Sequence, residues 1–382
     1  TDRQTDRQTD RQTDRQTDDV ALDILKAIAI FLVIYYHLGS RSIDYTLVGV
    51  KSFWKYFCFT CCSMGVPIFF FVNGSLVSRK DSVLWPQWSK KILKLLFLII
   101  FWSIISEVLF SEMSIGVEGR WESESFWLAV YNGKYINFLW FLKSLLVCYI
   151  FFPLLFPIIK NDNAKSGRCI YISALVLAVF GNNIATILLN VIKYFYDGSL
   201  FFDDSRTHNF IYPFLNDFRG GAFSHPVAYF IFGGIIYQKS FIVINQKLKR
   251  YMGAIIVFLC MFFLTAYGKM YQHAIGTYYN APGSNYDCIL VFLSVIGLYW
   301  MFQNIVIQNS LILRCIKLVG QNTLGIYLLH LPVGYFMRDS LITIPKNALR
   351  YSVLYSIAVL CISLLFTVIF KRIPLVRNLF KI

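Results

Sequence analysis

Three ionisable residues, Asp23, Lys26 and His37, lie within one apolar segment near the beginning of the chain. The segment covers residues 20–38 and is otherwise almost entirely apolar, so it is long enough to cross a lipid bilayer as a helix. Ionisable side chains are costly in the hydrocarbon region and usually have a function there. An imidazole exchanges protons near neutral pH and a lysine attracts anions, so the segment could combine general-base chemistry with anion binding.

The spacing of Lys26 and His37 places both on the same side of the predicted helix. They are eleven residues apart, which is about three helical turns and roughly 16 Å along the axis. A cation near one membrane face would then line up with an imidazole in the middle of the membrane or beyond it. Asp23 lies three residues before Lys26, and its simplest role is to orient that lysine and balance its charge. The geometry suits a long ligand with an anionic head and a reactive tail.

The composition indicates a polytopic membrane protein. The 382 residues are 57% hydrophobic and only 15% charged, whereas soluble domains carry about 25% charged residues. The net charge of +15 comes from 36 Lys and Arg against 21 Asp and Glu. Because the basic residues fall mainly in short loops between apolar runs, membrane topology explains them better than nucleic-acid binding. We expect an all-α protein whose transmembrane domain covers residues 20–382.

Ten apolar segments have the length and character of membrane spans. They cover residues 20–38, 56–78, 92–111, 138–159, 169–192, 223–238, 251–268, 287–307, 318–337 and 351–370. Loops on the side of the N-terminus carry 21 Lys and Arg, against 12 in the opposite loops. The positive-inside rule therefore predicts that both ends of the chain lie in the cytoplasm.

This topology places four ionisable residues in the outer half of four different spans. They are His37, Glu107, Lys143 and His330. Ionisable groups at a similar depth on separate helices predict a shared polar cavity. For each residue alone, a hydrogen-bonded or snorkelling structural role is the alternative.

The first 17 residues are four copies of Thr-Asp-Arg-Gln followed by a threonine. Such a polar repeat cannot bury a core, so we expect residues 1–19 to form a disordered tail. A tandem four-base repeat such as ACAG, read in successive frames, encodes this period of four residues. Because such tracts slip during replication, we hypothesise a phase-variable bacterial gene whose product alters the cell surface.

Metal binding and nucleotide hydrolysis are not expected from the sequence. The nine cysteines lie almost entirely in apolar segments, and the one cluster, Cys58, Cys61 and Cys62, has no histidine or carboxylate beside it. These cysteines are best interpreted as small buried apolar residues. The chain also lacks a His-Glu-x-x-His motif, a P-loop and a dinucleotide-binding glycine-rich turn.

Four motifs occur in order along residues 20–370. They are LDILKAIAIFLVIYYH (22–37), GVPIFFFVNGSLVSRK (65–80), LWFLKSLLVCYIFFPLL (139–155) and LVGQNTLGIYLLH (318–330). In these motifs the chain resembles the membrane-bound acyltransferase 3 family, the bacterial O-acyltransferases that modify surface and exported glycans. Each motif alone is weak, but four in the family's order within ten spans are a specific combination.

Two residues depart from the family's pattern. Lys26 stands where an arginine is usual, so a phosphate contact would be that of a point charge rather than a planar fork. Asn73 stands where a serine is common, and it keeps a polar group able to form hydrogen bonds.

The resemblance implies an acyl-CoA co-substrate, usually acetyl-CoA, used from the cytoplasm by a protein of the bacterial inner membrane with no permanently bound cofactor. The acceptor would be a sugar hydroxyl of a lipopolysaccharide, a capsule or another surface glycan. His37 is our candidate for the general base, or alternatively for a transient acyl carrier. His330 could orient His37, bind the acceptor or stabilise the oxyanion.

The CoA phosphates would meet basic residues at the cytoplasmic side. Lys26 is the first candidate, and Arg79 and Lys80 are the last two residues of the second motif. Arg79 and Lys80 could equally be ordinary positive-inside residues. The rival functions are a transporter or flippase for a lipid-linked glycan and a membrane scaffold without chemistry. A flippase would use ten spans with buried charge as well, but the halves show no inverted repeat. A scaffold leaves the alignment of Lys26 with His37 unexplained.

Overall fold

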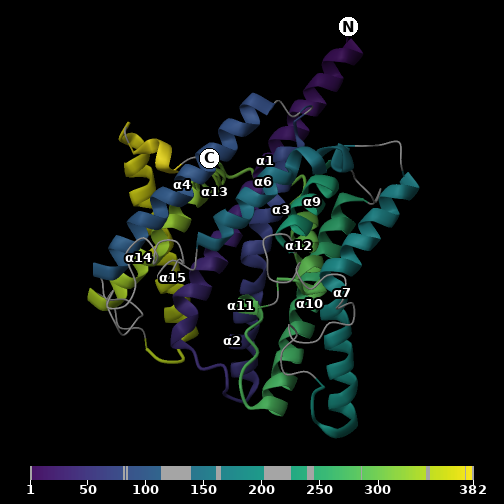
Figure 1. Cartoon of the computed structure of the whole chain (residues 1–382), viewed down its shortest axis with the longest axis vertical. Coiled ribbons are helices and arrows are strands. Elements are labelled where there is room, and N and C mark those ends of the chain that lie inside the picture. Colours follow the sequence, from purple (N-terminus) through teal and green to yellow (C-terminus); the bar gives the residue numbers. More distant parts are fainter. Residues whose placement is uncertain are drawn as a thin grey trace.

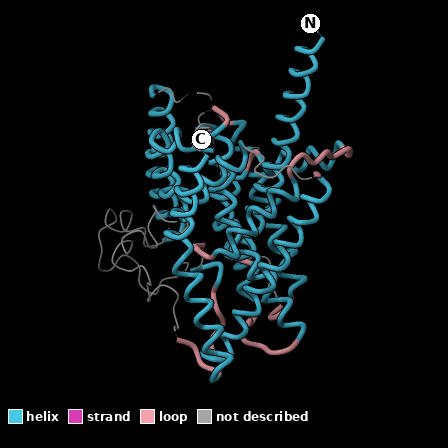
Figure 2. Tube along the Cα trace, turned by 90° about the vertical axis from the view of Figure 1, so that its right-hand side faces the viewer, coloured by secondary structure: helices cyan, strands magenta, loops and turns pink. Residues whose placement is uncertain are grey.

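The chain folds into a bundle of helices (Figures 1 and 2). The computed structural model describes residues 2–80, 82, 85–112, 139–160, 165–201, 225–238, 245–284, 286–340, 345–374 and 376–380. All the regular structure in these ranges is helical, and they contain no strand. The predicted all-α class is therefore confirmed for the described part of the chain.

Helix α1 (Asp2–His37) contains the segment with the three ionisable residues. Its membrane-spanning part begins at Val20, and the span continues to Ser42. The repeat is continuous with this helix from Asp2, and the expectation of a disordered tail stays a prediction. Because α1 is one uninterrupted helix from Lys26 to His37, the axial separation of roughly 16 Å between them holds.

The second span is built from two helices. Helix α2 (Val50–Cys61) passes through a short 3-10 turn, Cys62–Met64, into helix α3 (Gly65–Ser78). Together they form one candidate membrane span, Val50–Ser78. Nearly every α3 side chain is buried, so α3 is a central helix of the bundle.

Eight longer helices and one short one make up most of the remaining described bundle. They are α4 (Trp85–Glu112), α6 (Trp140–Lys160), α7 (Lys165–Asp197), α9 (His225–Gln238), α10 (Gln246–Ile275), α11 (Ala281–Ser284), α12 (Ile289–Phe302), α14 (Thr323–Ser340) and α15 (Leu349–Arg372). The predicted span 318–337 is wrong at its start. A separate helix, α13 (Ser310–Gly320), ends there, and α14 begins only after a turn.

Five helical segments are long and apolar enough to cross a membrane. They are Val20–Ser42, Val50–Ser78, Trp140–Pro157, Gln246–Ile275 and Leu349–Arg372, and the bent pair Leu175–Gly181 and Asn183–Asp197 would add a sixth. The predicted number of ten spans is therefore not confirmed. The two ends of the chain lie toward the same end of the bundle (Figure 1), as an even number of crossings would place them. The orientation with both ends in the cytoplasm stays a prediction.

Glycines allow the tightest helix contacts. A Cβ on Gly74 of α3 would lie 1.8 Å from the Phe230 carbonyl oxygen of α9, and one on Gly233 of α9 would lie 2.0 Å from the Phe71 carbonyl oxygen. Small residues permit this approach of backbones, which is the main source of helix association where water cannot drive it. The α3–α9 pair is thus a rigid centre for the bundle.

Helix α1 is held along its length by three neighbours. Gly65 of α3 packs against Val33, and Leu38, next to the helix end, packs against Gly334 of α14. At the other end of the span, Gly320 of α13 lies directly against Asp23. Both ends of the stretch between Asp23 and His37 are therefore fixed by packing.

Candidate active site

The structure brings His37 and His330 together. His37 is the last residue of α1, and His330 lies in the middle of α14, with ring centroids 5.7 Å apart. His330 is fully buried whereas His37 is half-buried. The two predicted catalytic residues, 293 positions apart in the chain, therefore form a pair.

One hydrogen bond sets the tautomer of His330. Its Nδ1 lies within hydrogen-bond distance of the Tyr327 carbonyl oxygen. A carbonyl oxygen can only accept, so Nδ1 carries the proton, and Nε2 of the neutral ring is an acceptor. This arrangement leaves His330 able to receive a hydrogen bond through Nε2 and so to orient a neighbouring donor.

Aromatic rings surround the histidine pair. Tyr36 packs edge-on against His37 with centroids 5.0 Å apart, and Tyr327 lies 5.6 Å from His330. The Tyr36 hydroxyl also meets the Asn280 amide at 3.5 Å. Such an environment combines apolar ring faces with a few hydrogen-bonding groups, as ligand sites in membrane and soluble proteins do.

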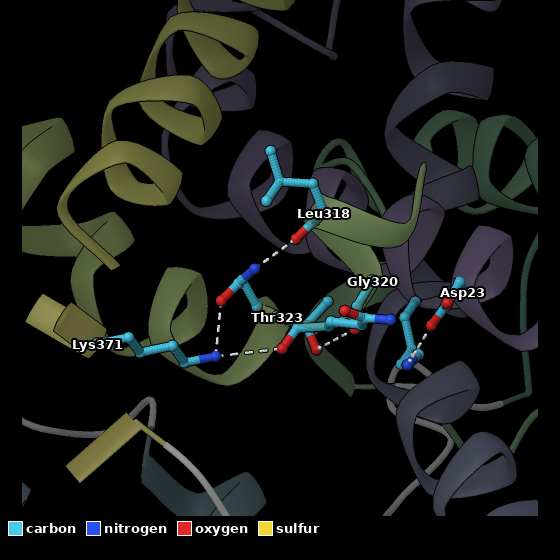
Figure 3. Close-up of polar contacts among 8 residues, drawn as sticks. Asp23, Leu318, Gly320, Thr323 and Lys371 are labelled. Carbon is cyan, nitrogen blue, oxygen red and sulfur yellow. Dashed lines mark hydrogen bonds and ion pairs between the residues drawn. The ribbon is translucent and has the colours of Figure 1, made fainter. Parts of the chain in front are cut away.

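The predicted pairing of Asp23 with Lys26 in α1 is also formed. Lys26 Nζ lies 2.5 Å from Asp23 Oδ1 across one turn, as the spacing predicted. Figure 3 shows Asp23 beside Gly320 in the turn that joins α13 to α14. A Cβ on Gly320 would lie 2.8 Å from both Oδ1 and Cβ of Asp23. The ion pair is therefore positioned by a direct backbone contact.

Helix α15 stabilises the turn between α13 and α14 by hydrogen bonds. Lys371 of α15 donates to the Asn322 side-chain oxygen (2.6 Å) and to the Gln321 carbonyl oxygen (3.2 Å). The Asn322 amide in turn donates to the Leu318 carbonyl oxygen at 2.7 Å. These bonds, drawn in Figure 3, satisfy carbonyl groups at the end of α13 and explain why the predicted span is interrupted there.

Arg79 and Lys80 form a basic cluster with a third cation, Lys91. The Arg79 guanidinium lies 4.9 Å from the centre of the Tyr237 ring, and Lys80 Nζ lies 5.3 Å from that of Trp88. Lys91 Nζ lies 4.3 Å from the centre of the Tyr149 ring. Burial, and secondarily the charge of Lys80, lower the pKa of Lys91 to about 8.

The basic cluster and Lys26 lie toward the same end of the bundle. Figure 1 shows α2 at the end of the bundle where α1 finishes, and α3 extending toward the end where α1 begins. Arg79 directly follows α3, so it lies at that same end. Sequence reasoning missed Lys91 as a site residue, although the nearby Trp85 and Trp88 are a signal for cation–π contacts.

Asn73 has a structural role. Its amide donates to the Phe69 carbonyl oxygen at 2.8 Å, and its side-chain oxygen accepts a bond from the Tyr149 hydroxyl at 2.9 Å. Trp88 Nε1 donates to the Tyr149 carbonyl oxygen at 2.7 Å. Asn73 therefore ties α3 to α6 and, through Tyr149, to the aromatic rings of the basic cluster.

Of the other two residues predicted to share the polar cavity, the structure describes the side chain of one. The Lys143 side chain is exposed on the surface of α6. Glu107 belongs to α4, but its side chain lies outside the described part of the structure.

The arrangement offers an imidazole base at one level of the bundle and cations at another. His37, which lies beside His330, is of a type that can take a proton from a hydroxyl. Lys26 and the basic cluster can hold an anionic group about 16 Å away along α1. A ligand that joins the two must be long, anionic at one end and reactive at the other.

Comparison with known proteins identifies the family. The model of a family described as an acyltransferase domain, Acyl_transf_3, matches residues 19–370. No curated protein and no solved structure matches the chain. The matched range begins next to Val20, where the membrane-spanning part of α1 starts, and contains the histidine pair, Lys26 and the basic cluster. The chain therefore belongs to the acyltransferase 3 family of membrane acyltransferases.

Proposed function

We propose that this membrane acyltransferase moves an acyl group, most simply acetyl, from cytoplasmic acyl-CoA to a sugar hydroxyl. The acceptor is a lipopolysaccharide, a capsule or another cell-surface glycan of a bacterium, and the protein lies in the inner membrane. The observation that carries the proposal is the His37–His330 pair, 5.7 Å between ring centroids, at the end of the helix that carries Lys26.

The donor end of the site is cationic. Lys26, Arg79 and Lys80 lie toward one end of the bundle, and Lys91 adds a fourth positive charge there. CoA carries phosphates at one end and the thioester at the other, at the end of the pantetheine arm. With its phosphates near Lys26, the arm can follow α1 so that the thioester reaches His37, roughly 16 Å away. The nucleotide then never crosses the membrane.

The chemistry at the thioester follows from the imidazole pair. A sugar hydroxyl is a weak nucleophile near neutral pH, so His37 removes its proton as the oxygen attacks the thioester carbon. The C–S bond breaks, the ester forms, and the thiolate of CoA takes up the proton. In the alternative order, His37 itself carries the acyl group between donor and acceptor. His330 positions His37 in either case.

The test is transfer of label by the purified protein. Wild type in lipid nanodiscs is incubated with radiolabelled acetyl-CoA and deacetylated cell-envelope glycan. We expect labelled glycan from wild type, loss of label with His37→Ala, and normal transfer with His273→Ala, which changes an exposed histidine. Equal transfer by His37→Ala contradicts the assignment of His37.

A second pair of variants tests the donor side. Lys26→Ala is expected to raise the KM for acetyl-CoA while the KM for the glycan stays unchanged. Lys26→Arg keeps the positive charge and is expected to restore the donor KM. A defect confined to the glycan KM argues against phosphate binding by Lys26. Movement of unlabelled glycan across vesicles without any transfer of acetyl would instead favour a flippase.

A further inference from the structure

A second group of rings is linked to the histidine pair, and the proposed mechanism does not use it. We call Trp140, His225 and Tyr286 the aromatic cluster. The Trp140 and Tyr286 rings are stacked, with centroids 5.7 Å apart and an interplanar angle of 27°. His225 lies 6.1 Å from Trp140 and 5.4 Å from Tyr286, centroid to centroid. The three residues come from the start of α6, the start of α9 and the segment before α12, so only the folded bundle brings them together.

A series of contacts connects the aromatic cluster with the histidine pair. Tyr327 lies 5.6 Å from His330 and 5.5 Å from Phe141, which directly follows Trp140. On the other side, the Tyr36 ring lies 5.0 Å from His37, centroid to centroid. The aromatic cluster is therefore linked to the histidine pair through Phe141 and Tyr327.

The aromatic cluster is separated from the basic cluster along two helices. Trp140 begins α6, and Tyr149, which contacts Lys91, is nine residues further, about 13 Å along the axis. His225 begins α9, and Tyr237, which contacts Arg79, is twelve residues further, about 18 Å along the axis. A phosphate-bearing donor would thus be held at the opposite end of these helices. The aromatic cluster suits a neutral ligand instead.

The chemistry of the cluster fits a pyranose ring. Trp140 and Tyr286 are half-buried, so part of each residue is accessible. An indole N–H, a phenol hydroxyl and an imidazole provide hydrogen-bonding groups at the edges of apolar faces. A pyranose presents the matching pattern, an apolar C–H face surrounded by hydroxyls.

Helix α7 carries a buried amide one turn from Phe180, and Phe180 is linked to the aromatic cluster through Tyr229. Phe180 packs against Tyr229 with centroids 6.0 Å apart, and the Tyr229 hydroxyl donates to the Tyr286 carbonyl oxygen at 2.9 Å. Asn183 lies one turn along the same face of α7 and is only 1% exposed. Its amide nitrogen and oxygen have no hydrogen-bond partner among the described residues. A buried amide without partners is costly, and a ligand hydroxyl would satisfy it.

We propose that the aromatic cluster, together with Asn183 of α7, is the subsite that holds the acceptor pyranose while one of its hydroxyls faces the His37–His330 pair. This inference rests on the proposed acyl transfer to a sugar. It assigns donor and acceptor to separate ends of the bundle, with the two histidines where they meet.

The experiment compares the KM values of both substrates in tryptophan variants. Trp140→Leu is expected to raise the KM for deacetylated envelope glycan about tenfold, the loss of one stacking contact, with the KM for acetyl-CoA unchanged. Trp140→Phe keeps an aromatic face and is expected to recover much of the loss. The matched control is Trp54→Leu, since Trp54 is 44% exposed on α2. An unchanged glycan KM in Trp140→Leu overturns the subsite.

Asn183→Leu separates a binding role from a structural one. Because no hydrogen bond to a described residue is lost, its melting temperature is expected to stay at or above that of wild type, while the glycan KM rises. A lowered melting temperature with an unchanged glycan KM assigns Asn183 to structure and contradicts its place in the subsite.

A binding measurement keeps this inference apart from the proposed function. Oligosaccharides released from deacetylated envelope glycan are titrated onto wild type and Trp140→Leu without acetyl-CoA. We expect the Kd to be about tenfold weaker for the variant. Equal Kd values overturn the subsite whether or not transfer occurs, whereas binding that depends on Trp140 without any transfer refutes only the proposed function.

Discussion

The contact between Gly320 and Asp23 allows a sharp test of how the ion pair of α1 is positioned. In Gly320→Ala, the new Cβ would lie 2.8 Å from both Cβ and Oδ1 of Asp23 and 2.9 Å from its Cα, where ordinary contacts begin at 3.4 Å. Two of these atoms cannot swing away by a change of rotamer. The backbones must therefore separate by about 0.6 Å, which is the difference between 3.4 and 2.8 Å.

The size of the effect follows from that displacement. Overpacking of this kind typically costs about 1–3 kcal/mol of stability. Lys26 moves with Asp23, because the two are joined by a 2.5 Å ion pair across one turn. A misplacement of 1 Å in an active site can cost about 100-fold in rate, so a shift of about 0.6 Å at the donor site is expected to raise the KM for acetyl-CoA about tenfold.

The assay measures both KM values and the melting temperature for Gly320→Ala and for Gly65→Ala. Gly65 also packs against α1, but its nearest neighbour would be a methyl group of Val33 at 3.1 Å. That contact can relax, so Gly65→Ala is expected to change the acetyl-CoA KM less than twofold. The reasoning is refuted if the two variants behave alike, or if Gly320→Ala lowers stability and leaves the acetyl-CoA KM unchanged.

Three further changes have defined outcomes. Gly74→Ala would place a Cβ 1.8 Å from the Phe230 carbonyl oxygen, so we expect a loss of about 3 kcal/mol or failure to fold, read from thermal unfolding in detergent; a wild-type melting temperature contradicts the close α3–α9 contact. Tyr149→Phe removes the 2.9 Å bond to Asn73 and is expected to cost about 1 kcal/mol of stability, measured in the same way; no loss means that the bond is dispensable. Lys91 has a lowered pKa of about 8, so it is charged below that pH and neutral above it, and the acetyl-CoA KM is expected to rise as the pH increases from 7 to 9. Lys91→Arg stays charged and should remove this rise; identical pH profiles count against Lys91 as a phosphate contact.

The depth of a residue along its helix axis was predictable from the sequence. The direction in which its side chain points around that axis was not. Apolar runs and basic loops assign a depth to each residue, and depth alone predicted that His37 and His330 would lie at one level. The same reasoning gave Lys143 a similar depth, yet its side chain is exposed on α6. Which face of a helix turns inward depends on its partners, and those contacts come from residues far away in the chain.

Interactions between residues one helical turn apart were predicted better than helix breaks that depend on residues far away in the chain. Asp23 and Lys26 are one turn apart, so helical spacing sufficed to predict their ion pair. The turn between α13 and α14 depends instead on Lys371, which bonds Gln321 and Asn322 from about fifty residues further on. The aromatic cluster and Asn183 were missed because only the folded bundle brings residues of α6, α7, α9 and the segment before α12 together. In α7 the signal was present as Asn183, Thr186 and Asn190, three polar residues on one face of an apolar segment.

The pairing of Lys26 with Asp23 has a consequence for biogenesis. An unpaired charge within a membrane span is costly, but here Asp23 and Lys26 lie in the first turns of the span Val20–Ser42 and each has its counterion within α1. The first helix can therefore enter the bilayer during synthesis without waiting for a partner helix. The imidazole pair cannot form so early, because His330 is added 293 residues after His37. Under the proposed mechanism, acyl transfer would therefore begin only once α14, which carries His330, has joined the bundle.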